Sequence, residues 1–94
     1  MMSEIKASKF VVKGRVQGVG YRWFVVSQAE ALNLTGTVKN LPDGSVEVFA
    51  QGAIDSLFKL RELLNKGPSF SRVDQVLQTD DVINTKIKEF RVIY

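Results

Sequence analysis

The order in which strand-like and helix-like patterns follow one another is the feature that most constrains how this chain can fold. Runs of β-branched and aromatic residues with period-two alternation indicate strands, and apolar residues three or four positions apart indicate helices. Strands are expected over residues 7–13, 37–41, 45–51, 73–78 and 90–94, and helices over about 22–32 and 53–66. The predicted order is therefore β-α-β-β-α-β, followed by a short terminal strand.

Local signals mark where these elements end. Gly14 is expected to end the first strand, Asn33 to end the first helix because asparagine tolerates a positive φ, and Gly67-Pro68 to stop the second helix. Pro42-Asp43-Gly44 between two alternating runs predicts a hairpin turn. Elements in this order are typical of an α/β (α+β) fold, the ferredoxin-like split βαβ sandwich, with two helices on one face of a mainly antiparallel sheet.

The composition bounds the size of the protein and its chemistry. With 94 residues, 45% of them hydrophobic and 24% charged, we expect a single globular domain over residues 1–94. The chain has no cysteine and no histidine, which excludes disulfides, zinc–thiolate sites and nucleophile pairs that depend on an imidazole. Any chemistry must therefore use the remaining polar side chains and the backbone, and no cofactor is expected.

The charge balance and the absence of long apolar runs bear on partners and location. Thirteen Lys and Arg against ten Asp and Glu favour an anionic partner, but they are too evenly matched to indicate a nucleic-acid binder. A small anion fits equally well. Residues 1–6 contain no apolar signal region, and no run of apolar residues approaches the length of a membrane span. We expect a cytoplasmic monomer without a membrane partner.

The segment from Gly14 to Gly20 holds three glycines in seven residues, between a predicted strand and a predicted helix. Glycines allow the mixed backbone angles with which successive N–H groups surround an anion, and the first N–H groups of a helix favour the same guest. Arg22 adds a guanidinium that can donate two hydrogen bonds to a phosphate. The glycine spacing matches neither the Walker nor the dinucleotide loop, so nucleotide binding is disfavoured.

The predicted topology brings this loop to a distant side chain. In a split βαβ unit the crossover helix joins two parallel strands, and the first two strands therefore end at the same side of the sheet. The glycine loop leaves the first strand there, and Asn40 lies near the end of the second. This end of the sheet is the candidate active site.

Two segments resemble the signatures of a known family, the acylphosphatases. Residues Gly14-Arg15-Val16-Gln17-Gly18-Val19-Gly20-Tyr21-Arg22 are similar to the first signature. Gly36-Thr37-Val38-Lys39-Asn40 and Asp43-Gly44-Ser45-Val46-Glu47 are similar to the second. Gly67-Pro68 and the ending from Phe90 to Tyr94 extend the resemblance over nearly the whole chain.

The resemblance implies a metal-free enzyme that hydrolyses an acyl phosphate to a carboxylate and inorganic phosphate, which would also be its product inhibitor. By motif position it gives Arg22 the role of binding the phosphate and Asn40 the role of placing the attacking water. The backbone amides of Gln17, Gly18, Val19, Gly20 and Tyr21 form the phosphate cradle. The chain departs from the family pattern at Tyr21, usually Phe, at Thr37, often Trp, and at Asn33, where Gly is common.

Simpler interpretations exist for the same residues. Arg22 alone could be a solvated surface residue and Asn40 a turn former. Arg15 and the Gln17 side chain either contact substrate or only cover the loop. Trp23 and Phe24 are expected to be partly buried, with no function.

Two other functions compete with the enzyme. Ferredoxin-like folds also serve as RNA-binding modules, but residues 46–50 offer one aromatic side chain and no RNP1 pattern. A domain that binds phosphate or carbamoyl phosphate within a larger assembly stays open.

Overall fold

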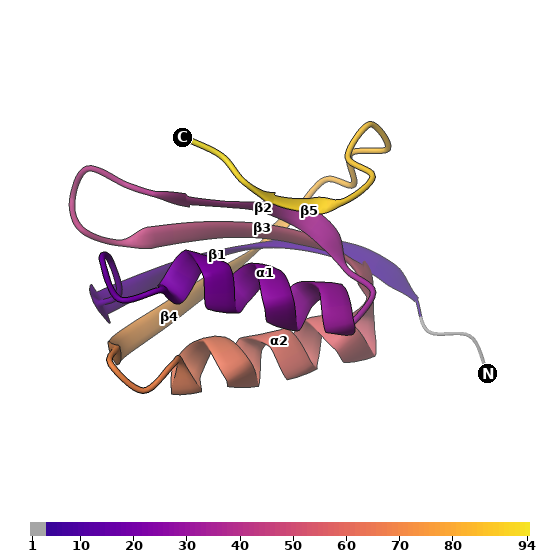
Figure 1. Cartoon of the computed structure of the whole chain (residues 1–94). Coiled ribbons are helices and arrows are strands. Elements are labelled where there is room, and N and C mark those ends of the chain that lie inside the picture. The colour runs from indigo at the N-terminus through magenta and orange to yellow at the C-terminus, as the bar shows by residue number, and fades with distance from the viewer. Residues whose placement is uncertain (1–3) are drawn as a thin grey trace.

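The computed structural model describes residues 4–94 and contains seven strands and helices in the predicted order (Figure 1). The strands are β1 (Ile5–Arg15), β2 (Thr35–Asn40), β3 (Val46–Ala53), β4 (Arg72–Asp81) and β5 (Phe90–Val92), and the helices are α1 (Tyr21–Ala31) and α2 (Ile54–Lys66). Residues 1–3, with which the predicted domain begins, lie outside the described residues.

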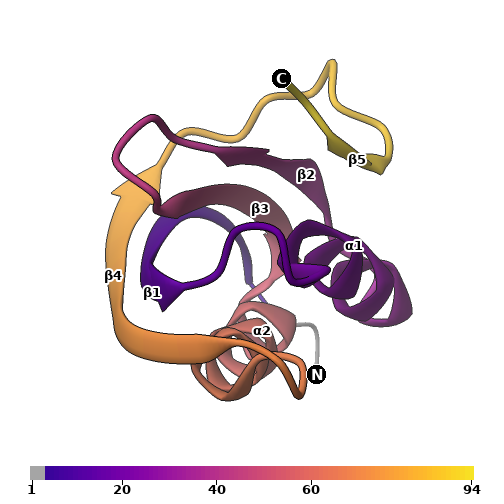
Figure 2. The same cartoon turned by 60° about the vertical axis from the view of Figure 1, so that its left-hand side comes forward.

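The five strands form one sheet in the order β4-β1-β3-β2-β5. Strand β1 pairs antiparallel with β3 and β4, whereas β2 pairs antiparallel with β3 and parallel with β5. Both helices cover the same face of this sheet, as the views in Figures 1 and 2 agree. The ferredoxin-like α+β prediction is confirmed, and the short terminal strand takes the edge beside β2.

Strands β1 and β4 run further than predicted. They pair with each other over residues 7–15 and 72–81, with a bulge between Lys13 and Gly14. Gly14 therefore does not end the strand. Its φ is 133°, and a Cβ there would lie 2.1 Å from the carbonyl oxygen of Arg72, so the bulge requires glycine.

The core lies between the sheet and the helices. In β1, Phe10 and Val12 are buried, while Val11 is partly exposed on the other face of the sheet. The buried helical side chains are Tyr21, Val25, Val26, Ala29, Leu57, Leu60 and Leu64. Trp23, which was expected to be partly buried, is 72% exposed, and Phe58 on α2 is 67% exposed. At about 100° per residue, both fall on the side of the helix away from the buried stripe.

The first helix ends as predicted, at an asparagine with a left-handed backbone. Asn33 has a φ of 59°, and the next amide, that of Leu34, donates to the carbonyl of Ala29 at 3.0 Å. The turn before β3 is also confirmed, since the Gly44 amide donates to the carbonyl of Leu41 across Pro42-Asp43.

At the end of the second helix, a side-chain hydroxyl donates a hydrogen bond in place of a missing backbone N–H. The Gly67 amide donates to the carbonyl of Leu63. The next carbonyl, that of Leu64, would accept from residue 68, but Pro68 has no N–H. The hydroxyl of Tyr21, at the start of α1, donates to it instead at 2.7 Å. This bond joins the first turn of α1 to the last turn of α2.

Candidate active site

The loop between β1 and α1 has the backbone of an anion-binding nest. Gly18 and Gly20 have φ values of 73° and 78°, and no heavy atom lies within 4 Å of where a Cβ would stand at either. Glycine is therefore needed here for the backbone angle and not for space. Among residues 4–94, no oxygen accepts a hydrogen bond from the amides of residues 17–21. Those donors remain available to a ligand.

The first turn of α1 adds to the attraction for an anion. Its N-cap residue, Gly20, makes no side-chain hydrogen bond, and no acidic residue occupies the first turn. The positive end of the helix dipole is thus not neutralised by the chain itself. Arg22 lies in this turn, as predicted.

A cavity of about 210 Å³ opens beside this turn. Gly18, Gly20 and Arg22 line one part of it, and the other lining residues are Val16, Tyr21, Trp23, Val92 and Tyr94. The guanidinium carbon of Arg22 lies 5.4 Å from the centroid of the Tyr94 ring, a cation–π distance. The Tyr94 ring therefore supports the arginine from one side.

Asn40 occupies the end of β2, level with three buried valines. The pairing places Val12 opposite both Val76 and Val46, and Val46 opposite Asn40, so the four residues form one row across the sheet. Since alternate residues of a strand face the same side, Asn40 shares the helix-bearing face with the buried Val38. A polar side chain therefore completes a row that is otherwise apolar.

The side-chain oxygen of Asn40 stands out within the described part of the chain. It is buried and has no hydrogen-bond partner, the single such side-chain atom among residues 4–94. A buried acceptor without a donor is unfavourable in folded proteins, and each case calls for an explanation. An acceptor in this state is suited to bind a small donor.

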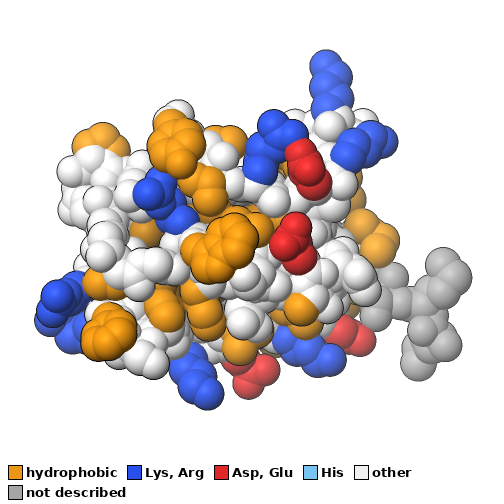
Figure 3. Space-filling view, viewed as in Figure 1, with side chains coloured by type: hydrophobic (Ala, Val, Ile, Leu, Met, Phe, Trp, Pro, Cys, Tyr) orange, Lys and Arg blue, Asp and Glu red, His pale blue; other side chains and the backbone are white. Residues whose placement is uncertain are grey.

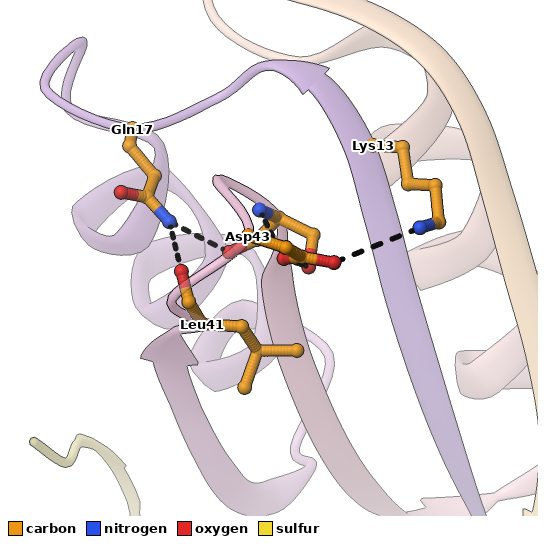
Figure 4. Close-up of polar contacts among 5 residues, drawn as sticks. Lys13, Gln17, Leu41 and Asp43 are labelled. Carbon is orange, nitrogen blue, oxygen red and sulfur yellow. Dashed lines mark hydrogen bonds and ion pairs between the residues drawn. The ribbon is translucent and has the colours of Figure 1, made fainter.

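Gln17 links the glycine loop to the hairpin that follows Asn40. Its side-chain amide donates to the carbonyl of Leu41 at 2.9 Å and to that of Ser45 at 2.8 Å (Figure 4). The sequence left the role of this side chain undecided, and its two acceptors show that it holds the loop against the residue next to Asn40. No local sequence signal identifies this contact, because the acceptors are backbone atoms 24 and 28 positions away.

The hairpin itself is held by Asp43. Its carboxylate accepts hydrogen bonds from the hydroxyl and the amide of Ser45 and lies 3.8 Å from the Lys13 ammonium (Figure 4). The bonds from the Ser45 hydroxyl and amide hold the pKa of this carboxyl below its usual value. Asp43 therefore acts in the turn, as predicted.

The structure brings some of the predicted site residues into one cavity and leaves others beside it. Gly18, Gly20, Tyr21 and Arg22 line the cavity. Gln17, Val19 and Asn40 are not part of its lining, although Val92, which is, pairs with Val38 two positions before Asn40. Trp23 and the chain end at Tyr94 were not predicted to take part. In the sequence, both could have been noticed as aromatic residues, one directly after Arg22 and one at the C-terminus.

The described residues offer neither a membrane span nor a metal site of acidic ligands. In residues 4–94 no helix combines the length and apolar character needed to cross a membrane. Over the same range no three Asp or Glu side chains gather closely enough to hold a metal ion.

Comparison with known proteins gives a consistent result. The family model described as acylphosphatase matches residues 8–92. An acylphosphatase of Koribacter versatilis is 49% identical over 84 residues, covering 89% of this chain and 76% of its own. The crystal structure of acylphosphatase from Bacillus subtilis has a TM-score of 0.90 at 35% identity, covering 97% of this chain and 100% of its own. An acylphosphatase structure from Coxiella burnetii has a TM-score of 0.90 at 40% identity, covering 95% and 93%.

Proposed function

This chain belongs to the acylphosphatase family, a family of hydrolases that act on acyl phosphates, and on that premise we propose how its residues divide the reaction. Arg22 and the backbone amides of residues 17–21 hold the phosphoryl group. Asn40 positions the attacking water. The products are a carboxylate and inorganic phosphate.

The phosphate-binding role is supported by the state of the loop. Its amides have no acceptor within residues 4–94, its glycines hold left-handed angles, and the helix behind it has an uncapped positive end. Arg22 remains protonated at every relevant pH and can donate two hydrogen bonds to phosphoryl oxygens. These fixed donors stabilise charge that shifts onto the phosphoryl oxygens in the transition state.

The single observation that carries the proposal is the buried, unpartnered oxygen of Asn40. A water held there would donate one hydrogen to this oxygen and direct its lone pair toward phosphorus. Gln17 strengthens the argument because it ties the loop to Leu41, the next residue along the chain. Arg22, the loop amides and Asn40 then face one phosphoryl group from two sides.

The chemistry needs no acidic or basic side chain. The water oxygen bonds to phosphorus as the bond from phosphorus to the acyl oxygen breaks, and the electron pair leaves on the carboxylate. A carboxylate is a stable anion and requires no proton to depart. The proton of the water passes to a phosphoryl oxygen of the substrate. We further propose that the protein works without a metal, as a cytoplasmic monomer of one domain.

The test is hydrolysis of benzoyl phosphate in the presence of a chelator. We expect an active wild type, a raised KM and weaker phosphate inhibition for Arg22→Ala, and for Asn40→Ala a kcat lowered about 100-fold or more with phosphate affinity retained. Arg72→Ala and Asn65→Ala are the matched controls, since both side chains are exposed and neither lines the cavity.

Two outcomes contradict the proposal. Activity that a chelator removes would refute metal independence, and variants of Arg22 and Asn40 as fast as the controls would refute the assigned roles. Phosphate binding without any turnover would instead assign a phosphate-binding module.

A further inference from the structure

The cavity beside Arg22 has two chemically different parts. Gly18, Gly20 and Arg22 form the polar part, to which the proposed function assigns the phosphoryl group. Besides Tyr21, the rest of the wall comes from the valine and aromatic side chains of Val16, Trp23, Val92 and Tyr94. The apolar residues therefore come from three separate segments of the chain.

Trp23 and Tyr94 reach the solvent at this place. Trp23 is 72% exposed and Tyr94 is fully exposed. Figure 3, which views the helix-bearing face, shows hydrophobic side chains at the surface near the N-terminal end of α1, next to a Lys or Arg side chain. Scattered exposed hydrophobic residues are ordinary, but two aromatic rings and two valines that line one cavity with an arginine form a site for an amphipathic ligand.

The direction of the reaction determines what these rings contact. In an in-line displacement the attacking and leaving oxygens lie on opposite sides of phosphorus. The oxygen of Asn40 is buried, so the attacking water would lie on the inner side of the phosphoryl group. The acyl group must then point outward, toward the cavity mouth where Trp23 and Tyr94 are exposed.

We infer that this apolar wall binds the acyl group of the substrate and that Trp23 makes the protein selective for acyl phosphates with a compact aromatic acyl group. The inference rests on the proposed function and names the substrate class of the same site. A cavity of about 210 Å³ is smaller than the roughly 300–1,000 Å³ typical of sites for drug-sized ligands. It suits a single ring attached to the phosphate.

The first experiment compares kcat/KM for benzoyl phosphate and acetyl phosphate. For Trp23→Ala we expect a loss of about three- to tenfold on benzoyl phosphate, through KM, and a change within about twofold on acetyl phosphate, since ring contacts are of this strength. Trp23→Phe retains most of the selectivity. Phe70→Ala, which removes an aromatic ring that is 82% exposed and outside this cavity, changes neither value.

The second experiment uses the fact that Trp23 is the single tryptophan of the chain. In benzoylphosphonate the acyl carbon is bonded directly to phosphorus. The compound lacks the bridging oxygen of an acyl phosphate and therefore is not hydrolysed there. We expect it to shift the Trp23 fluorescence to shorter wavelength and to bind more tightly than acetylphosphonate. This measurement needs only the wild type and does not depend on the folding of a variant.

The outcomes separate this inference from the proposed function. Equal losses on both substrates, an unchanged ratio, or equal affinities for the two phosphonates overturn the role of Trp23 while leaving acyl phosphate hydrolysis intact. A wild type that hydrolyses neither substrate overturns both.

Discussion

At the scale of single residues, Tyr21 shows how one side chain can replace a missing backbone donor. Its ring is buried and its hydroxyl donates to the carbonyl of Leu64, which Pro68 cannot serve. The family resemblance places phenylalanine at this position, which would leave that carbonyl without this donor. The tyrosine thus stabilises both the end of α2 and the first turn of α1, where the glycine loop joins the helix.

Tyr21→Phe is expected to lower the free energy of unfolding by about 1–3 kcal/mol, because a buried carbonyl loses its partner. Urea unfolding measures this difference. Tyr94→Phe is the matched control, because Tyr94 is fully exposed. Variants of equal stability would show that the Leu64 carbonyl finds another donor.

The Tyr21 hydroxyl should also make the free energy of unfolding depend on pH in alkaline solution. Burial raises the pKa of Tyr21 above its ordinary value of about 10. At pH values below this ordinary pKa, the hydroxyl is protonated in both the folded and the unfolded protein, and it does not make stability depend on pH. Above this pKa the unfolded chain loses the proton while the folded one retains it, so stability falls as pH rises. Urea unfolding between pH 9 and 11 should show a steeper fall for wild type than for Tyr21→Phe, and parallel curves would contradict this.

At position 40 we expect that a residue favourable for stability is unfavourable for activity. The row of Val76, Val12 and Val46 ends at this residue, whose oxygen is buried without a partner. Asn40→Val continues the apolar row in a strand that favours β-branched residues, and it should raise the free energy of unfolding by about 1 kcal/mol while turnover is lost. Denaturant unfolding and benzoyl phosphate hydrolysis test the two parts, and a destabilised but active variant would contradict both.

At the scale of elements, the site depends on the attachment of a loop to a hairpin. The loop after β1 carries the amides and the hairpin after β2 follows Asn40, and the Gln17 side chain joins them through two hydrogen bonds. Asp43 and Lys13 hold the hairpin toward β1 in the same region. Each element therefore limits the movement of the other.

Gln17→Ala removes both bonds of this link and should weaken phosphate binding by up to about thirtyfold, since each such bond contributes about 1 kcal/mol. Inhibition by inorganic phosphate measures the change, and hydrogen exchange should show faster exchange of the loop amides. Gln75→Ala, an exposed position on β4, is the control. An unchanged inhibition constant would mean that the loop keeps its shape without Gln17.

Strand boundaries illustrate what apolar periodicity can predict at this scale. Alternation identified five strands, but it predicted β1 and β4 too short. For β4 the reason is that most of the strand is exposed on the sheet edge and carries little apolar signal. The error at Trp23 has a different cause: its position around α1 lies away from the buried stripe, where even a large apolar side chain stays exposed.

At the scale of the whole molecule, the strand order β4-β1-β3-β2-β5 brings the site together. Because β3 lies between β1 and β2 and pairs antiparallel with both, the ends of β1 and β2 lie at one end of the sheet. Strand β5 then brings Val92 and Tyr94 to the same cavity. Residues from near both ends of the chain thus surround one cavity.

A ligand that binds only this assembled site should stabilise the fold. Inorganic phosphate at about ten times its dissociation constant should add about 1.4 kcal/mol, which for a chain of this length corresponds to a rise in Tm of roughly 6–11 °C. Differential scanning fluorimetry with sodium chloride at equal ionic strength is the control for general salt effects. Arg22→Ala should remove most of the rise, and an equal rise in that variant would place phosphate elsewhere.

The sequence by itself determined which elements form, where the turns and helix ends lie, and which segments form the candidate site. Those features depend on local preferences, such as the left-handed angles of Gly18, Gly20 and Asn33, which act within a few residues. Only the tertiary structure decided that Gln17 binds two distant carbonyls, that Asn40 completes a row of valines, and that Trp23 and Tyr94 border one cavity. These relations depend on strand order and register, which the packing of the whole core selects, and no short segment of the chain contains that information.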